Sequence, residues 1–226
     1  MLAWNVSGGH FNPCLTIAMY VAEKDFGGNL VTAGIMILAQ FLGAFAGILW
    51  GYLALLAPDA TDGADYSVPP GTVGATIPLI PPAFPDYGIG KDGYTRNWQC
   101  FWGILMATIM LSLGFVTIKH KATRFSEDSV LNSGLFYAIQ GAVVAMSIKF
   151  GPTGINPALA SAYMVLTVTQ NTNVSADHYN HYLWVYMLVP FLGGAIGGVL
   201  HWIHTKCVEK QGADNDREEL IPTSEK

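Results

Sequence analysis

The feature that most constrains this chain is a short motif that occurs twice. Asn12-Pro13-Cys14 follows a stretch with two glycines, and Asn156-Pro157-Ala158 follows Gly154-Ile155. Asparagine is a favoured helix N-cap, and proline is favoured at the first helical position. Each copy therefore predicts a loop that abruptly starts a short helix. We expect half-helices over about residues 12–21 and 156–165.

Long uncharged stretches indicate a membrane protein. Residues 29–57, 97–118, 129–148 and 182–205 contain no Asp, Glu, Lys or Arg, and each is long enough to cross a bilayer. A soluble protein with four buried helices is the less favoured alternative, because several stretches are apolar all round. We predict an all-α integral membrane domain over residues 1–206 and a disordered cytoplasmic tail over 207–226. The expected spans are 31–57, 98–118, 129–149 and 182–204.

The basic residues predict the orientation. Most of them lie before the first predicted span, between the second and third, or after the last, whereas Lys91 and Arg96 lie in a loop with five aspartates. The three basic segments, with Lys24, with Lys119, Lys121 and Arg124, and with Lys206 and Lys210, fall on one side if the segment after Asn156 enters and leaves the membrane by the same face. The positive-inside rule then places the loop from Lys119 to Arg124 and the tail in the cytoplasm.

The two motifs should enter the membrane from opposite faces, because three predicted spans separate them. Their half-helices would then meet N-terminus to N-terminus, as in an inverted repeat. The loops before them would line a path with carbonyl oxygens, and Asn12 and Asn156 would offer N–H donors to a permeant oxygen. Two positive helix ends repel cations. This arrangement predicts a passive path that small neutral molecules cross in single file.

At these residues the chain resembles the aquaporin (major intrinsic protein) family, up to about Lys206. Ser-Gly-Gly-His-Phe-Asn-Pro before Leu15-Thr16 is similar to the family's first signature, and Gly-Ile-Asn-Pro-Ala to its second. Gln40 with Gly43, Gly47 and Gly51 is similar to the family's third helix, and such glycines allow close helix packing. The resemblance implies a homotetramer in a lipid bilayer, with water as the main permeant and glycerol, hydrogen peroxide or ammonia as companions.

Three residues depart from the family's pattern. Cys14 replaces the usual alanine, Leu159 stands where water-selective members have arginine, and Val144 stands where they have histidine. Asn-Pro-Cys and this leucine are similar to the unorthodox branch of the family. We expect an apolar constriction near Val144, Thr153 and Leu159, and we expect His10 either to line the inner vestibule or to pack the loop. The predicted pore residues are His10, Asn12, Pro13, Cys14, Val144, Thr153, Asn156, Pro157, Ala158 and Leu159.

Repeat symmetry requires two spans before Asn12, but only eleven residues precede it. We therefore expect most of the first two helices of an aquaporin-like repeat to be absent, and we expect this chain alone to conduct poorly unless something supplies the missing wall. The alternative function is a non-conducting structural or junctional membrane protein that uses the fold for assembly.

Other function classes find little support in the sequence. No catalytic constellation, metal-spaced cysteine cluster or phosphate-binding loop is visible, so we predict neither an enzyme nor a cofactor. No basic patch suggests nucleic acid as a partner. Asn173-Val174-Ser175 is a candidate N-glycosylation site on the predicted outer side.

Overall fold

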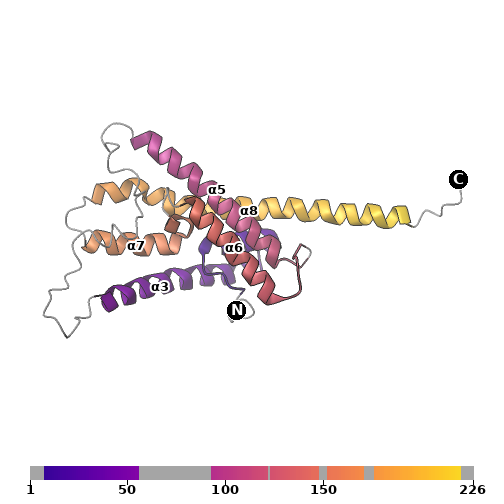
Figure 1. Ribbon diagram of the computed structural model, residues 1–226, viewed down its shortest axis with the longest axis horizontal. Helices are drawn as coiled ribbons and strands as arrows, with labels where there is room; N and C mark the ends of the chain where they lie inside the picture. The colour runs from indigo at the N-terminus through magenta and orange to yellow at the C-terminus, as the bar shows by residue number, and fades with distance from the viewer. Residues whose placement is uncertain (1–7, 56–92, 122, 148–151, 171–175, 220–226) are drawn as a thin grey trace.

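The computed structural model describes residues 8–55, 93–121, 123–147, 152–170 and 176–219, and all regular secondary structure in them is helical (Figure 1). The elements in chain order are α2 (Pro13–Glu23), α3 (Leu30–Leu55), α5 (Gly93–Lys119), α6 (Ser129–Ser147), the 3-10 turn η2 (Pro152–Ile155), α7 (Pro157–Gln170) and α8 (Ala176–Glu219).

Four of these helices are long and apolar enough to cross a membrane, and they confirm the prediction of an all-α membrane fold. The segments that meet this criterion are Leu30–Gly51, Trp98–Lys119, Ser129–Ser147 and Trp184–Lys210. The two helices that follow the Asn-Pro motifs, α2 and α7, are shorter. The chain thus has long helices for the wall and two short helices for the interior.

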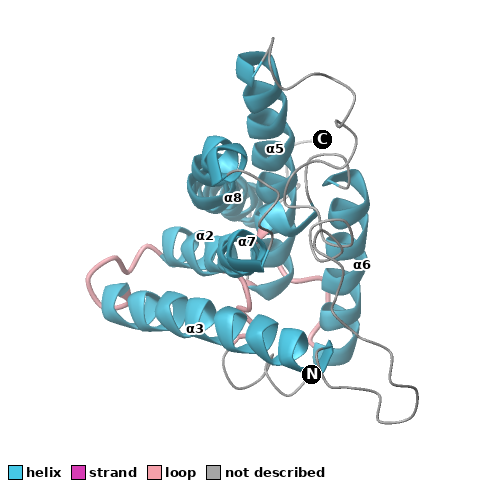
Figure 2. Cartoon of the chain, turned by 90° about the vertical axis from the view of Figure 1, so that its left-hand side faces the viewer, coloured by secondary structure: helices cyan, strands magenta, loops and turns pink. Residues whose placement is uncertain are grey.

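The two short helices lie in the middle of the bundle. Figure 2 shows α2 and α7 at the centre, with α8 above them, α3 below and α6 to one side. One buried cluster joins α2, α5 and α6 around Leu15, Phe115 and Phe136. A second cluster joins α5, α7 and α8 around Ile104 and Tyr186. Burial of these apolar side chains fixes both half-helices against α5, with α6 beside α2 and α8 beside α7.

Glycines on α8 allow this close packing. Gly193 and Gly197 face α5, where a Cβ added to Gly197 would lie 2.7 Å from the Cβ of Ser112. Gly194 and Gly198 face α2, where a Cβ added to Gly198 would lie 2.6 Å from the carbonyl oxygen of Ala18. Any larger side chain would separate the helices, so these four positions hold α2 and α5 against α8.

The glycines predicted to pack closely on α3 have no such neighbours. A Cβ added to Gly43, Gly47 or Gly51 would meet no described atom within 4 Å. The expectation of close packing is therefore not met within the described chain. The spacing of glycines shows which face of a helix permits close approach, but it does not say where the neighbouring helix lies.

The prediction of a disordered tail from residue 207 is wrong for the described part of the tail. Helix α8 continues to Glu219 and projects beyond the bundle as a single helix (Figure 1). The extension contains Lys, Glu, Gln, Ala and Arg, which are good helix formers, and it has no proline. The polar composition of the tail correctly suggests that it lies outside the bundle, but the helix-forming residues in it favour a helix over a disordered chain.

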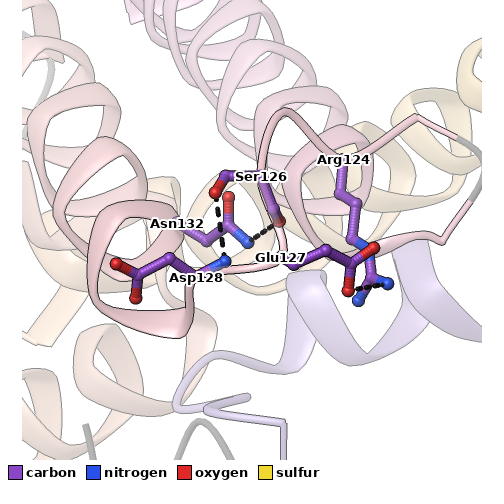
Figure 3. Close-up of polar contacts among 5 residues, drawn as sticks. All are labelled: Arg124, Ser126, Glu127, Asp128 and Asn132. Atoms are coloured by element: carbon purple, nitrogen blue, oxygen red, sulfur yellow. Dashed lines mark hydrogen bonds and ion pairs between the residues drawn. The ribbon is translucent and has the colours of Figure 1, made fainter.

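The short loop before α6 is held by local polar contacts (Figure 3). Ser126 Oγ accepts a hydrogen bond from Asp128 N at 3.0 Å, and Ser126 O accepts one from Asn132 Nδ2 at 2.6 Å. Asp128 Oδ1 accepts from Val130 N at 2.7 Å and so caps the first turn of α6. Arg124 forms an ion pair with Glu127. This loop positions α6 relative to α5.

Candidate functional site

The first motif starts α2 through a side-chain cap. Asn12 has extended backbone angles, and its Oδ1 accepts a hydrogen bond from Cys14 N at 3.0 Å. Pro13 follows at the start of the helix, where the absence of an N–H has no consequence. The chain reaches Asn12 through Gly8 and Gly9, whose φ angles of 80° and 71° favour glycine. The local sequence thus dictates the sharp entry.

The second motif makes the same cap from a different approach. Asn156 Oδ1 accepts hydrogen bonds from Ala158 N at 3.1 Å and from Leu159 N at 3.4 Å. The chain reaches it through the 3-10 turn η2 in place of two left-handed glycines. A Cβ added to Gly154 in this turn would lie 2.5 Å from a ring carbon of Tyr186. Glycine is therefore needed here for space.

The two motifs bond to each other in a reciprocal pattern. Asn12 Nδ2 donates to the carbonyl oxygen of Ile155 at 2.9 Å, and Asn156 Nδ2 donates to the carbonyl oxygen of Phe11 at 3.1 Å. Each asparagine thus bonds to the residue just before the other asparagine. A side-chain amide has two N–H groups, so each asparagine retains a second donor. This pairing joins the N-termini of α2 and α7 at one point.

A single cavity of about 890 Å³ contains this point. Both asparagines line it, together with side chains from α3, α5 and α6. None of its described lining residues is Asp, Glu, Lys or Arg. The lining mixes amides and hydroxyls with apolar side chains: Gly9, His10, Phe11, Asn12, Leu15, Met36, Ala39, Gln40, Gly43, Ala44, Leu111, Ser133, Phe136, Tyr137, Gln140, Val144, Ile155, Asn156, Ala158 and Leu159.

The predicted pore residues divide into two groups. One group lines the cavity: His10, Asn12, Val144, Asn156, Ala158 and Leu159. The other group is buried and is not part of the lining: Pro13, Cys14 and Pro157. The thiol of Cys14 lies 3.6 Å from the carbonyl oxygen of Ile155 and 3.9 Å from Ser112 Oγ. The side chain of Thr153 and the whole of Asn173 lie outside the described residues, so those two predictions stay predictions.

His10 both lines the cavity and packs the loop. Its ring meets the ring of Phe115 edge to face, with centroids 5.2 Å apart. Its carbonyl oxygen accepts a hydrogen bond from Gln40 Nε2, and the same amide group lies 2.9 Å from Thr16 Oγ1. Gln40 therefore ties α3 to both the loop and the first turns of α2.

Sequence reasoning missed the polar stripe on α6. Ser133, Tyr137 and Gln140 line the cavity with Val144, and they fall on one face of the helix. The signal was present in the spacing, since side chains three and four residues apart share a helix face. Polar side chains at such spacing inside an uncharged span indicate a surface that faces a cavity.

Comparison with known proteins gives matches over most of the chain. The model of the family described as "Major intrinsic protein" matches residues 1–201. Aquaporin-6 of Laccaria bicolor is 26% identical over 203 residues, which are 88% of this chain and 60% of that protein. Probable aquaporin TIP1-2 of Oryza sativa subsp. japonica is 28% identical over 199 residues, 87% of this chain and 62% of that protein. The chain thus spans about three fifths of the length of these relatives.

Proposed function

The chain belongs to the major intrinsic protein family, and from that premise we propose that it forms a passive path across the membrane for water and small neutral solutes. The observation that carries the proposal is the reciprocal pairing of Asn12 and Asn156 inside a cavity. The relatives bear the name aquaporin, which agrees with this function. Members of this family are channels, so no catalytic step is assigned.

The paired asparagines act as the central binding point. Each uses one N–H to hold the opposite motif and offers its second N–H to a passing oxygen atom. The N-termini of α2 and α7 add positive partial charge at the same place. A molecule with lone pairs is stabilised there, whereas a cation is repelled. The path therefore favours neutral solutes over ions.

The cavity lining sets the selectivity. Val144, Leu159 and Phe136 present apolar surface, and the α6 stripe with Gln40 supplies the hydrogen-bonding groups. A cavity lined in this way accepts water and tolerates a small solute that has an apolar part. Water is the first expected permeant, with glycerol, hydrogen peroxide and ammonia as further ones.

Three further features belong to the same proposal. The Lys119-to-Arg124 loop and the projecting end of α8 lie in the cytoplasm, in agreement with the positive-inside rule. The protein assembles as a homotetramer in which each copy has its own path. Cys14 and Leu159 make it similar to the unorthodox branch, and Leu159 leaves the constriction without the arginine that water-selective members have there.

The test is stopped-flow light scattering on proteoliposomes that hold the full chain, with water and glycerol gradients in parallel. We expect shrinkage that is slow for a channel but measurably faster than in empty liposomes, in line with the expectation of poor conduction by this chain alone. Asn156→Asp should return the rate to that of the lipid, because a carboxylate replaces the free N–H donor. Asn29→Asp is the matched control, since Asn29 contacts Glu23 at the surface and does not line the cavity. It should conduct like the unmodified chain.

Lipid-like rates for the unmodified chain with both solutes would contradict the channel. They would favour the second function, a non-conducting membrane protein that uses the fold for assembly. The long exposed apolar face of α3, with Leu38, Leu42 and Leu49, is the observation that speaks for assembly.

A further inference from the structure

Two lysines gather around one tryptophan near the C-terminal end of α2. Lys24 ends α2 in a left-handed conformation, and its Nζ lies 5.2 Å from the ring centroid of Trp202. Lys206 lies one turn after Trp202 on α8, with its Nζ 4.5 Å from the same centroid. The two ammonium groups therefore lie near the same indole ring, and their Nζ atoms are less than 10 Å apart.

This cluster contains donors without acceptors. In the described part of the chain, neither Lys24 nor Lys206 forms an ion pair with a carboxylate. The Trp202 indole N–H is buried and has no hydrogen-bond partner among the described residues. A buried indole N–H normally finds an acceptor. The two lysines are exposed, so an oxygen-rich anion at the surface would meet both ammonium groups after a small shift of the lysine side chains, whereas the buried indole N–H lies out of its reach.

The carboxylates nearest in sequence to the two lysines do not form ion pairs with them in the described residues. Glu23 Oε2 accepts a hydrogen bond from Asn29 Nδ2 at 3.1 Å, and Asp25 Oδ1 accepts one from Gly28 N at 3.0 Å. Glu209 lies on the same helix as Lys206 but forms no ion pair with it in the described residues. The protein therefore leaves both ammonium groups available to an external anion.

The position of the cluster points to a lipid as the source of that anion. Val199, Leu200 and Ile203, next to Trp202 on α8, are 40%, 40% and 51% exposed. Trp184 lies eighteen residues earlier on α8, near Phe101, which corresponds to about 27 Å of helix. That length is close to the thickness of a bilayer core. Tryptophans are enriched at both membrane interfaces, so Trp202 lies at headgroup level.

We propose that Lys24 and Lys206, gathered around Trp202, bind the phosphate of an anionic phospholipid. The two exposed ammonium groups contact the phosphate oxygens, the Trp202 ring holds both lysines at the interface, and the acyl chains lie along the exposed apolar side chains of α8. The site is specific for a net negative headgroup, because the choline group of phosphatidylcholine would meet two like charges. The proposal needs only a membrane-embedded chain and is independent of conduction.

The experiment is native mass spectrometry of the full chain in detergent, titrated separately with phosphatidylglycerol and phosphatidylcholine. We expect the chain to prefer phosphatidylglycerol, and Lys24→Gln or Lys206→Gln each to lower that preference about fivefold, the typical contribution of one lysine near an anionic surface. Lys210→Gln is the matched control, because Lys210 lies on the same helix without a contact to Trp202, and it should leave the preference unchanged. Arginine at both positions should retain it.

Several outcomes would overturn the proposal. Equal binding of both lipids, or an equal loss in Lys210→Gln, would show that no specific site exists. Displacement of bound phosphatidylglycerol by excess inorganic phosphate would identify a site for free anions instead of lipid. Melting temperatures in phosphatidylcholine show whether each variant is folded. If a glutamine variant unfolds, the double variant with arginine at positions 24 and 206 is the test. Loss of its preference for phosphatidylglycerol would contradict a site that depends on positive charge.

Discussion

The two Asn-Pro motifs make equivalent hydrogen bonds, but different neighbouring atoms pack against them. Both asparagines cap a helix and donate to the carbonyl before the other asparagine. The helix after the first motif rests on α8 through backbone contacts, where Gly194 meets the carbonyl of Cys14. The turn before the second motif rests on side chains, because Gly154 meets Tyr186 and Ile104. Backbone atoms cannot rotate away from an intruding group, whereas side chains can.

The hydrogen bonds between the two motifs are therefore separable from the packing that supports each motif. The bonds depend on the Asn-Pro dipeptide, which is the same in both halves. The supports depend on which neighbour the fold supplies, and that neighbour differs. Substitutions that add the same single methyl group should therefore destabilise the two halves to different extents.

The largest effect is expected from Gly194→Ala. The new methyl group would overlap the backbone of α2 at Cys14, so α2 and α8 must separate. We expect a loss of about 3 kcal/mol in the free energy of unfolding, at the upper end for overpacking. Denaturant unfolding in detergent would measure it. Gly47→Ala is the control, since no described atom lies near it, and it should be neutral or stabilise by about 0.5 kcal/mol.

A smaller effect is expected from Gly154→Ala in the second motif. The methyl group meets the Tyr186 ring at 2.5 Å and the Ile104 Cδ1 at 2.8 Å. Both side chains are buried, so they can shift only within the packed core, but such a shift leaves the backbone of the neighbouring helices in place. We expect a loss of about 1.5 kcal/mol. Adding Ile104→Val should recover part of that loss, because it removes the Cδ1 atom. A loss equal to that of Gly194→Ala would contradict the distinction between backbone and side-chain support.

Gln40→Ala should weaken only the first motif. Gln40 contacts the carbonyl of His10 and the hydroxyl of Thr16, and none of its recorded bonds reaches the second motif. We expect a loss of about 1 kcal/mol for the missing bonds. Hydrogen exchange should rise at residues 8–16 and stay unchanged at 154–160. A uniform rise in both segments would show that α3 supports the halves together.

The smallest effect is expected from Cys14→Ala, which makes the first motif match Asn156-Pro157-Ala158. The thiol contacts Ile155 and Ser112 at 3.6 and 3.9 Å, which are weak contacts, and it does not line the cavity. We expect a change below about 1 kcal/mol and an unchanged water permeability. Stopped-flow measurements would reveal a functional role for the thiol if permeability fell.

The local features of the fold were readable from the sequence, and the long-range ones were not. The helix starts at Pro13 and Pro157 follow from capping, which depends on adjacent residues. The partners of glycines did not follow, because Gly43 and Gly47 on α3 have the same spacing as Gly193 and Gly197 on α8 but no neighbour within 4 Å among the described residues. Which glycine face contacts another helix depends on how the helices are arranged in the fold.

The site was predictable in its residues but not in its bonding. The duplicated motif identified Asn12 and Asn156, since each has the same local sequence. Their use of one N–H for the opposite carbonyl depends on a contact across more than 140 residues, which no local pattern encodes. The polar stripe on α6 became meaningful only when its cavity was known.

The most direct test of the account is the water permeability of Asn12→Ala, Asn156→Ala and the double variant in proteoliposomes, with folding checked by thermal unfolding. Because the two asparagines act as one reciprocal unit, each single variant should fall to the rate of empty liposomes, and the double variant should be no slower. A single variant that retains the permeability of the unmodified chain would contradict the paired asparagines as the centre of the path.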